Sequence, residues 1–214
     1  MPFHKIKRAH DFSYNNSTKF VFMNLIRLAE LRDAERIRDI YAPYVKDTEL
    51  TFHFEVPSVQ FFEQKITEIQ KKYCWLVYEV NNQIIGYAYA MEHRPKNAYQ
   101  WTIESTIYLD LKYREKGVGT VLYKTLLFAV KAQGFCKVLA GLTIPNEASY
   151  KFHQKFGFEH FARYNKIGFK HNRWQSVDWL ELNINHSDFP PKLQSIGSII
   201  ETDEWKSFLD SIEH

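Results

Sequence analysis

A glycine-rich turn between a predicted strand and a long predicted helix limits the possible folds of this chain more than any other feature. The segment reads YLDLKYREKGVGTVLY and places Arg114, Gly117 and Gly119 between the two elements. Glycines in such a turn let backbone N–H groups approach an anion closely, and the positive end of the helix dipole favours the same ligand. Thr120 adds a hydroxyl in the first helical turn. The turn therefore predicts a phosphate-binding site where a sheet meets a helix.

Two common nucleotide-binding motifs do not fit this turn. No Gly-Lys-Ser/Thr sequence follows the glycines, which excludes a Walker motif. The third glycine and the downstream ribose-binding acid of a dinucleotide fingerprint are also missing. Taken alone, the Arg-x-x-Gly-x-Gly pattern is equally compatible with an ordinary turn capped by glycine, so the rest of the chain has to decide.

Hydrophobic periodicity predicts a mixed order of helices and strands. Helices are expected at residues 33–45, 57–72, 118–133 and 146–156, and strands at residues 25–28, 74–80, 84–91, 99–109, 137–143 and twice within 158–183. Asn81 and Asn82 suit a tight hairpin turn between two of these strands. This order predicts an α/β or α+β fold, with helices on both faces of a mixed sheet.

Composition excludes several classes of protein. The 214 residues suit one domain, and the net charge of +3 is spread along the chain without the basic run of a nucleic-acid surface. Cys74 and Cys136 lie in apolar, strand-like runs, so we expect small buried side chains and no disulfide framework. No run approaches the roughly 18 apolar residues of a membrane helix, and the polar start lacks the apolar core of a signal peptide. We therefore expect a cytoplasmic protein without a membrane or nucleic-acid partner.

The chain divides by composition into three parts. Residues 1–22 form a polar arm, 23–186 the main domain, and 187–214 a tail after Pro190 and Pro191. Met23 is either the natural start or a residue that follows a genuine docking arm, and mass spectrometry of the native gene product would decide. The tail carries a short amphipathic helix, with Trp205, Phe208, Leu209 and Ile212 on one face. We expect this helix to pack on its own chain, and a homodimer contact is the alternative.

Several segments together resemble one known family. The turn is similar to the acetyl-CoA pyrophosphate loop of GNAT N-acetyltransferases, whose pattern Q/R-x-x-G-x-G/A is matched by Arg114, Gly117 and Gly119. NAYQWTIESTIYL (97–109), LYKTLL, AQGF, GLTIPNEAS and GFKHNRW narrow the resemblance to the phosphinothricin acetyltransferase family, over roughly residues 25–184. The resemblance implies the GNAT acyl-CoA N-acyltransferase fold, with a mostly antiparallel central sheet. It also implies acetyl-CoA as co-substrate, with no metal.

The resemblance further implies where acetyl-CoA binds. The edge of the strand at Ile107, Tyr108 and Leu109 would pair with the pantetheine amides, which act as a substitute strand and require an open edge. The other implied cofactor contacts come from the turn and two helix starts: Arg114, Glu115, Lys116, Gly117, Val118, Gly119, Thr120 and Asn146. Asn146 also suits the N-cap of its helix, and both roles can hold at once.

Two residues are candidates for catalysis. Alternation along the strand places Glu104 on one face with Thr106 and Tyr108, where a carboxylate could deprotonate an attacking amine as general base. The alternative for Glu104 is a structural pair with Arg94 or Lys96. His153 follows Asn146 by two helical turns, and the resemblance gives it a role near the sulfur or the substrate. Its alternative is a filler of the core or surface.

Arg94 and Lys96 are the candidates for acceptor binding, because basic side chains suit an amino acid's carboxylate or anionic head. The alternative is plain solvation. Glu55 and Ser176 depart from the pattern of phosphinothricin-acetylating members, which have arginine and an acidic residue there. The predicted activity is direct acetyl transfer, in a ternary complex, to a small acceptor of the phosphinothricin, methionine sulfone or methionine sulfoximine type. The alternatives are another amine (polyamine, antibiotic or protein N-terminus) and a non-catalytic acyl-CoA-binding module.

Overall fold

The computed structural model describes residues 8–10, 22–114 and 116–212 of the chain. Within these ranges, eight strands form one sheet in the spatial order β1-β2-β3-β4-β5-β6-β8-β7. The strands are β1 (Arg8–His10), β2 (Phe22–Leu28), β3 (Trp75–Val80), β4 (Gln83–Glu92), β5 (Thr102–Leu109), β6 (Lys137–Ile144), β7 (Glu159–Lys170) and β8 (Arg173–Asn183). Neighbouring strands are antiparallel except β5 and β6, which run parallel.

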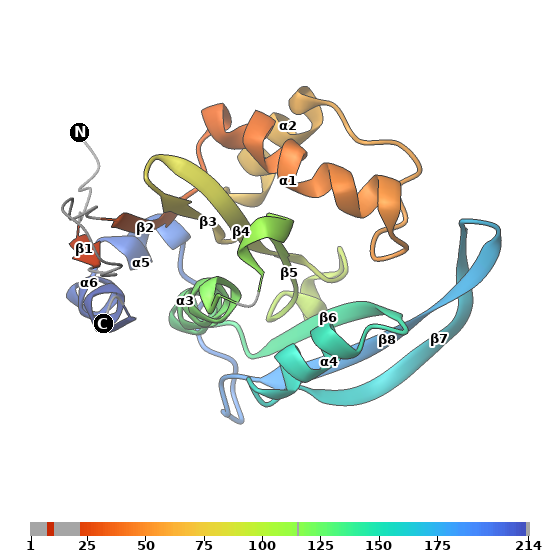
Figure 1. The fold of residues 1–214 in the computed structure, drawn as a ribbon. Helices are drawn as coiled ribbons and strands as arrows, with labels where there is room; N and C mark the ends of the chain where they lie inside the picture. Colours follow the sequence, from red (N-terminus) through yellow and green to blue (C-terminus); the bar gives the residue numbers. More distant parts are fainter. Residues whose placement is uncertain (1–7, 11–21, 115, 213–214) are drawn as a thin grey trace.

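Helices cover both faces of this sheet (Figure 1). One face carries α1 (Ala34–Asp47) and α2 (Val59–Ile69), and the other carries α3 (Val118–Ala132) and α4 (Glu147–Gln154). The chain ends with α5 (Ile196–Ile200) and α6 (Asp203–Ile212), which contact the outer side of α3. The fold is thus the mixed, mostly antiparallel α/β sheet that the sequence predicts.

Two hydrophobic cores hold the layers together. Under α1 and α2, the predicted helical stripes meet the aromatic rings of β3 and β4, and these buried residues include Ile37, Ile40, Phe62, Ile66, Trp75 and Tyr87. The other core lies between the sheet and α3, which is apolar almost all round because α5 and α6 cover its outer side. A sheet covered on both faces explains why β3 and β4 read as nearly continuous apolar runs.

Local turn chemistry agrees with the sequence at one hairpin and differs at one strand start. Asn81 and Asn82 have φ values of 50° and 63°, as a tight turn between β3 and β4 requires. The expected strand over 99–109 is wrong at its start, because Asn97–Tyr99 forms a 3₁₀ turn and β5 begins at Thr102. The N–H groups of Tyr99 and Gln100 donate to Lys96 O and Asn97 O, so these residues bond locally and not to a neighbouring strand.

The described segments nearest the two ends of the chain, β1 and α6, contact the main domain. β1 pairs with the first residues of β2, so the boundary expected between residues 22 and 23 falls inside β2. In α6, Trp205 is buried and Phe208 stacks on Phe128 of α3 at a ring-centroid distance of 3.9 Å. Packing on the same chain is therefore the arrangement that the amphipathic helix adopts.

Cys74 and Cys136 are free thiols, and no helix in the described ranges could span a membrane.

Replacing Trp205 with alanine should lower the free energy of unfolding by about 3–5 kcal/mol, because it leaves a cavity between α6 and α3. The exposed Ser207 lies on the same helix, and Ser207→Ala should change stability by less than about 0.5 kcal/mol. Urea denaturation followed by circular dichroism measures both. A Trp205→Ala variant as stable as the Ser207→Ala control would mean that α6 adds nothing to the core.

Candidate active site

The parallel strands β5 and β6 stay together for three residues and then separate. Thr102, Ile103 and Glu104 face Lys137, Val138 and Leu139. Beyond this point β5 remains paired with β4 as far as Leu109, and β6 remains paired with β8 as far as Ile144. A cavity of about 640 Å³ opens between the two strands. The open strand edge that the sequence analysis requires is therefore present.

The backbone of β5 presents different groups to this cleft at successive residues. Asp110 N donates to Ile85 O at 2.8 Å, so the even-numbered residues of β5 direct their N–H and C=O groups toward β4. Leu109 faces the other way, but the hydroxyl of Tyr44 donates to its carbonyl at 2.6 Å. Of Ile107, Tyr108 and Leu109, it is therefore Ile107 whose backbone groups face the cleft without a neighbouring strand. Tyr108 faces β4 through its backbone.

The predicted phosphate turn borders the same cleft. Gly117 is the N-cap of α3 with φ of 80°, a conformation that glycine adopts without strain. Thr120 N already donates to Gly117 O, so the N–H groups of Val118 and Gly119 are those without an intrahelical acceptor. A Cβ at Gly119 would lie 3.1 Å from Leu109 Cδ1, so a larger residue there would crowd the cleft wall. The turn can bind an anion through backbone donors.

The other residues expected at this turn fall into three groups. Arg114 and Thr120 are exposed and line the cavity, with the Arg114 guanidinium 5.1 Å from the Tyr44 ring centroid. Val118 is buried in the core under α3, and Lys116 is exposed with its ammonium over the Tyr113 ring. Glu115 lies outside the described residues.

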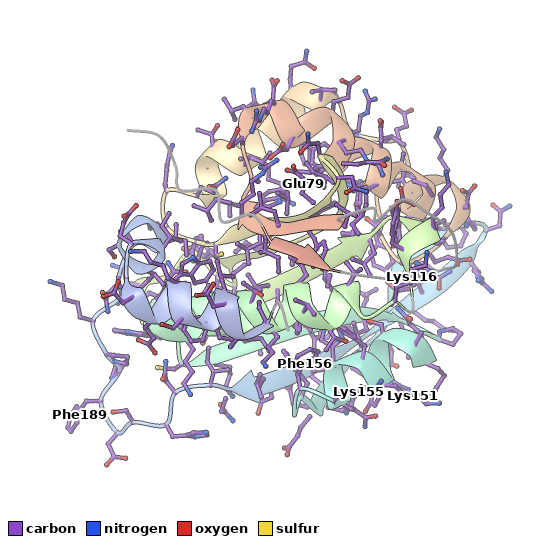
Figure 2. The ribbon with its side chains drawn as sticks, turned by 60° about the vertical axis from the view of Figure 1, so that its left-hand side comes forward. Glu79, Lys116, Lys151, Lys155, Phe156 and Phe189 are labelled. Carbon is purple, nitrogen blue, oxygen red and sulfur yellow. The ribbon has the colours of Figure 1, made fainter. Side chains whose placement is uncertain are left out.

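Basic side chains surround the mouth of the cleft. Besides Arg114, the cavity is lined by Lys151 and Lys155 at the α4 side, both exposed. Figure 2 shows these two lysines and Lys116 on one side of the molecule. None of the described lining residues carries a carboxylate. This donor set fits a phosphorylated ligand. The sequence analysis missed Lys151 and Lys155, although their i, i+4 spacing after Asn146 places both on one helix face.

Helix α4 contributes Asn146 and His153 to the cleft. Asn146 Oδ1 accepts from Ser149 N at 3.2 Å, which is the predicted N-cap, and the residue also lines the cavity. His153 is buried, and its Nδ1 lies 2.8 Å from Ser149 O. Burial lowers the pKa of His153, so the ring is neutral near pH 7. Because a carbonyl only accepts, Nδ1 carries the hydrogen and Nε2 the lone pair.

Glu104 has a partner that the sequence analysis missed. Its Oε1 lies 2.7 Å from His93 Nδ1, and His93 Nε2 accepts from Arg94 Nε at 3.3 Å. In a neutral ring these two bonds require the hydrogen on Nδ1, so His93 donates to Glu104. The expected alternative, a direct pair with Arg94 or Lys96, does not form. His93 directly follows β4, the antiparallel neighbour of β5, and that position was the available signal.

Trp179 completes this face of the sheet. It lies opposite Gly141 in the β6–β8 register, and a Cβ at Gly141 would lie 3.3 Å from the indole. The indole meets the His93 ring edge-on at 6.2 Å, and its buried Nε1 has no hydrogen-bond partner. The sequence analysis assigned Trp179 no chemistry. The structure places an unpaired donor beside the Glu104–His93 pair.

This geometry agrees with what the chain is similar to. Residues 26–179 match the family model described as the acetyltransferase (GNAT) domain. The chain belongs to the GNAT acetyltransferase family. It is therefore an N-acetyltransferase.

Relatives narrow the family assignment. The chain is 34% identical over 152 residues to phosphinothricin N-acetyltransferase of Streptomyces viridochromogenes, which covers 71% of this chain and 83% of the relative. It is 29% identical over 109 residues to L-methionine sulfoximine/L-methionine sulfone acetyltransferase of Pseudomonas aeruginosa, covering 51% and 63%. Among solved structures, the Sinorhizobium meliloti GNAT phosphinothricin acetyltransferase in complex with AcCoA matches with a TM-score of 0.75 and 28% identity, covering 78% of this chain and 93% of that chain.

Gly119→Val in this GNAT acetyltransferase should weaken acetyl-CoA binding about 10-fold or more, because the branched side chain crowds the turn's backbone donors. Gly197→Val in α5 is a matched control, since a Cβ there meets no atom closer than 3.9 Å. Isothermal titration calorimetry measures the affinity, and circular dichroism verifies folding. Equal affinity in a folded Gly119→Val variant would place the phosphate cradle elsewhere.

Proposed function

We propose that this chain transfers the acetyl group of acetyl-CoA to the primary amine of a small, amino-acid-like acceptor. The observation that carries the proposal is the divergence of β5 and β6. It brings an open strand edge, a helix N-terminus and a buried histidine to one cleft, with Glu104 at the point where the strands part. Glu104 is hydrogen-bonded to His93, which holds its carboxyl group on that face.

Acetyl-CoA, when bound, supplies the acetyl thioester that an amine nitrogen attacks. The N–H groups of Val118 and Gly119, with the side chains of Arg114, Lys151 and Lys155, would hold its phosphates. The backbone of Ile107 would pair with its amide groups, as an added strand does at a free sheet edge. Asn146 also lines this cleft. The reaction needs neither a metal nor a redox cofactor.

Glu104 would act as the general base. The acceptor binds as an ammonium ion, and Glu104 takes the proton directly or through one water before the nitrogen attacks in a ternary complex. The hydrogen bond from His93 Nδ1 orients the carboxylate.

His153 would act at the sulfur. The neutral ring cannot donate from Nε2, so its role depends on negative charge developing nearby, which raises the proton affinity of the ring. After the attack, the nitrogen of the adduct has a second proton to lose, which Nε2 of the neutral His153 would accept, directly or through a water, and pass to the departing sulfur.

The acceptor class follows from chemistry shared by the relatives' named substrates. Phosphinothricin and methionine sulfoximine are both α-amino acids with a tetrahedral head group at the end of a short side chain. Arg94 and Lys96 are exposed on the loop after His93 and would hold the α-carboxylate. The departures remain: Glu55 is exposed, and Ser176 Oγ accepts from Lys166 N at 3.0 Å within the β7–β8 hairpin.

An acetyl-CoA consumption screen tests the proposed activity. It should include phosphinothricin, methionine sulfone, methionine sulfoximine, ordinary amino acids, a polyamine, an amine antibiotic and a peptide N-terminus. We expect turnover with amino acids that carry a tetrahedral head. Turnover with the polyamine, antibiotic or peptide alone would contradict the acceptor class, and acetyl-CoA binding without consumption by any amine would favour a binding module.

Glu104→Gln should lower kcat about 100-fold or more near neutral pH, the usual scale for loss of a general base, while acetyl-CoA affinity stays within about 2-fold. Glu159 is exposed on β7, and Glu159→Gln serves as the control for a lost carboxylate. Steady-state kinetics with the best acceptor of the screen measures both. An unchanged kcat in Glu104→Gln would remove this residue from the mechanism.

A further inference from the structure

A second cavity, of about 180 Å³, lies under α1 and α2 on the same face of the sheet as Glu104. At roughly 30 Å³ per water molecule it holds about six waters, the size of a short side chain with one head group. Thr106 and Tyr108 of β5 line both this cavity and the large cleft, so the two spaces adjoin at β5. A ligand in the second cavity can therefore reach the place where acetyl transfer is proposed.

The distance to Glu104 suits a small acceptor. Glu104 and Thr106 are two residues apart on one face of β5, which corresponds to about 7 Å along the strand. A molecule whose head group lies in the cavity and whose amine lies beyond Thr106 thus presents that amine to Glu104. The cavity therefore lies where the side chain of an amino acid would reach if its amine were next to Glu104.

The cavity contains a cation without an acidic neighbour. The partly buried ammonium of Lys65, on α2, donates to the Tyr89 hydroxyl at 2.7 Å and lies 4.6 Å from the centre of the Tyr89 ring. None of the described residues that line the cavity is an aspartate or glutamate. A partly desolvated cation surrounded by hydroxyl groups and aromatic rings attracts an anion more strongly than an exposed lysine does.

The part of the cavity wall formed by Tyr41, Thr51 and His53 is also subject to positive charge. His53 Nδ1 bonds to the Tyr41 hydroxyl at 2.8 Å, and Tyr41 also bonds to Thr51. Burial, followed by the charges of Lys65 and Lys170, lowers the pKa of His53, so the imidazole is neutral near pH 7 and leaves Lys65 as the cation of this cavity. Two lysines therefore act on this wall.

Lys170 fixes the loop that forms this wall. Its buried ammonium donates to three carbonyls, Val45 O, Thr48 O and Thr51 O, at 2.7 to 2.8 Å. These bonds attach the end of α1 and the loop carrying Thr51 to the tip of the β7–β8 hairpin. The loop that carries Thr51 is therefore held in place by bonds within the protein.

We propose that this cavity is the head-group subsite of the acceptor and that Lys65 binds an anionic phosphinate, phosphonate or carboxylate at the end of an amino-acid side chain. The hydroxyls of Tyr89 and Thr106 complete the anion's hydrogen bonds. This assignment depends on the proposed acetyl transfer at Glu104. It separates two roles: Lys65 reads the side-chain head, while Arg94 and Lys96 meet the α-carboxylate. Acceptors with an anionic head should be preferred over those with a neutral sulfone.

Lys65→Met, which keeps most of the apolar stem, tests this subsite. We expect KM for phosphinothricin to rise about 10-fold, the loss of one charge-assisted hydrogen bond, while KM for methionine sulfone and for acetyl-CoA changes less than about 2-fold. Lys65→Arg keeps the positive charge and should retain most of the preference for phosphinothricin over methionine sulfone. Lys71→Met removes an exposed lysine shortly after α2 and should change nothing. Tyr89→Phe, which removes one partner of Lys65, should weaken the preference in the same direction.

Equilibrium binding of phosphinothricin in the presence of CoA, measured by calorimetry, separates failure of the subsite from failure of the proposed activity. Binding weakened about 10-fold by Lys65→Met, without acetylation by the wild type, would support anion binding at Lys65 but refute the activity and, with it, the acceptor role of the cavity. If the wild type acetylates phosphinothricin but Lys65→Met changes KM equally for phosphinothricin and methionine sulfone, or changes neither KM, the subsite is refuted and the activity stands. A wild type that binds no amino acid with an anionic head would also overturn the subsite.

Discussion

The separation of β5 from β6 after three residue pairs is the constraint on which the rest of the site depends. Each strand keeps a full antiparallel partner on its outer side, so the sheet tolerates a gap in its centre. The gap leaves backbone groups of Ile107 facing an open cleft, and such groups need water or a ligand as partner. The same gap lets the N-termini of α3 and α4 both border the cleft, where their unpaired N–H groups are available to an anion.

Strand β5 joins the two halves of the proposed chemistry. Its alternation directs Ile107 and Leu109 to the side of α3, whereas Thr106 and Tyr108 point to α1 and α2. One strand edge can thus hold the acetyl donor while one strand face guides the acceptor. Glu104 lies at the last paired position before the gap, and its bond to His93 fixes the carboxylate where both halves meet. The Lys65 subsite extends this arrangement toward the acceptor's far end.

Much of the fold and part of the site could be predicted because the signals are local. The glycine turn before α3, the Asn81–Asn82 hairpin and the N-cap at Asn146 each depend on a few consecutive residues. Contacts between distant segments could not be predicted in this way. Three such contacts form only when separate strands and helices come together in the fold. They are the hydrogen bond of His93 to Glu104, the hydrogen bond of Tyr44 to the carbonyl of Leu109, and the packing of Trp179 on Gly141. The five-residue helix α5 is too short to give a periodic pattern.

Residue-resolved amide hydrogen exchange with and without saturating CoA most directly tests whether the β5 edge holds the donor. The Ile107 amide should exchange readily in the free protein and at least about 10-fold more slowly with CoA, because a ligand amide replaces the missing strand. The Val118 and Gly119 amides should slow as well. The Tyr108 amide, which faces β4, should change little. An Ile107 amide that is already protected without ligand, or that is unaffected by saturating CoA, would contradict the proposed binding mode.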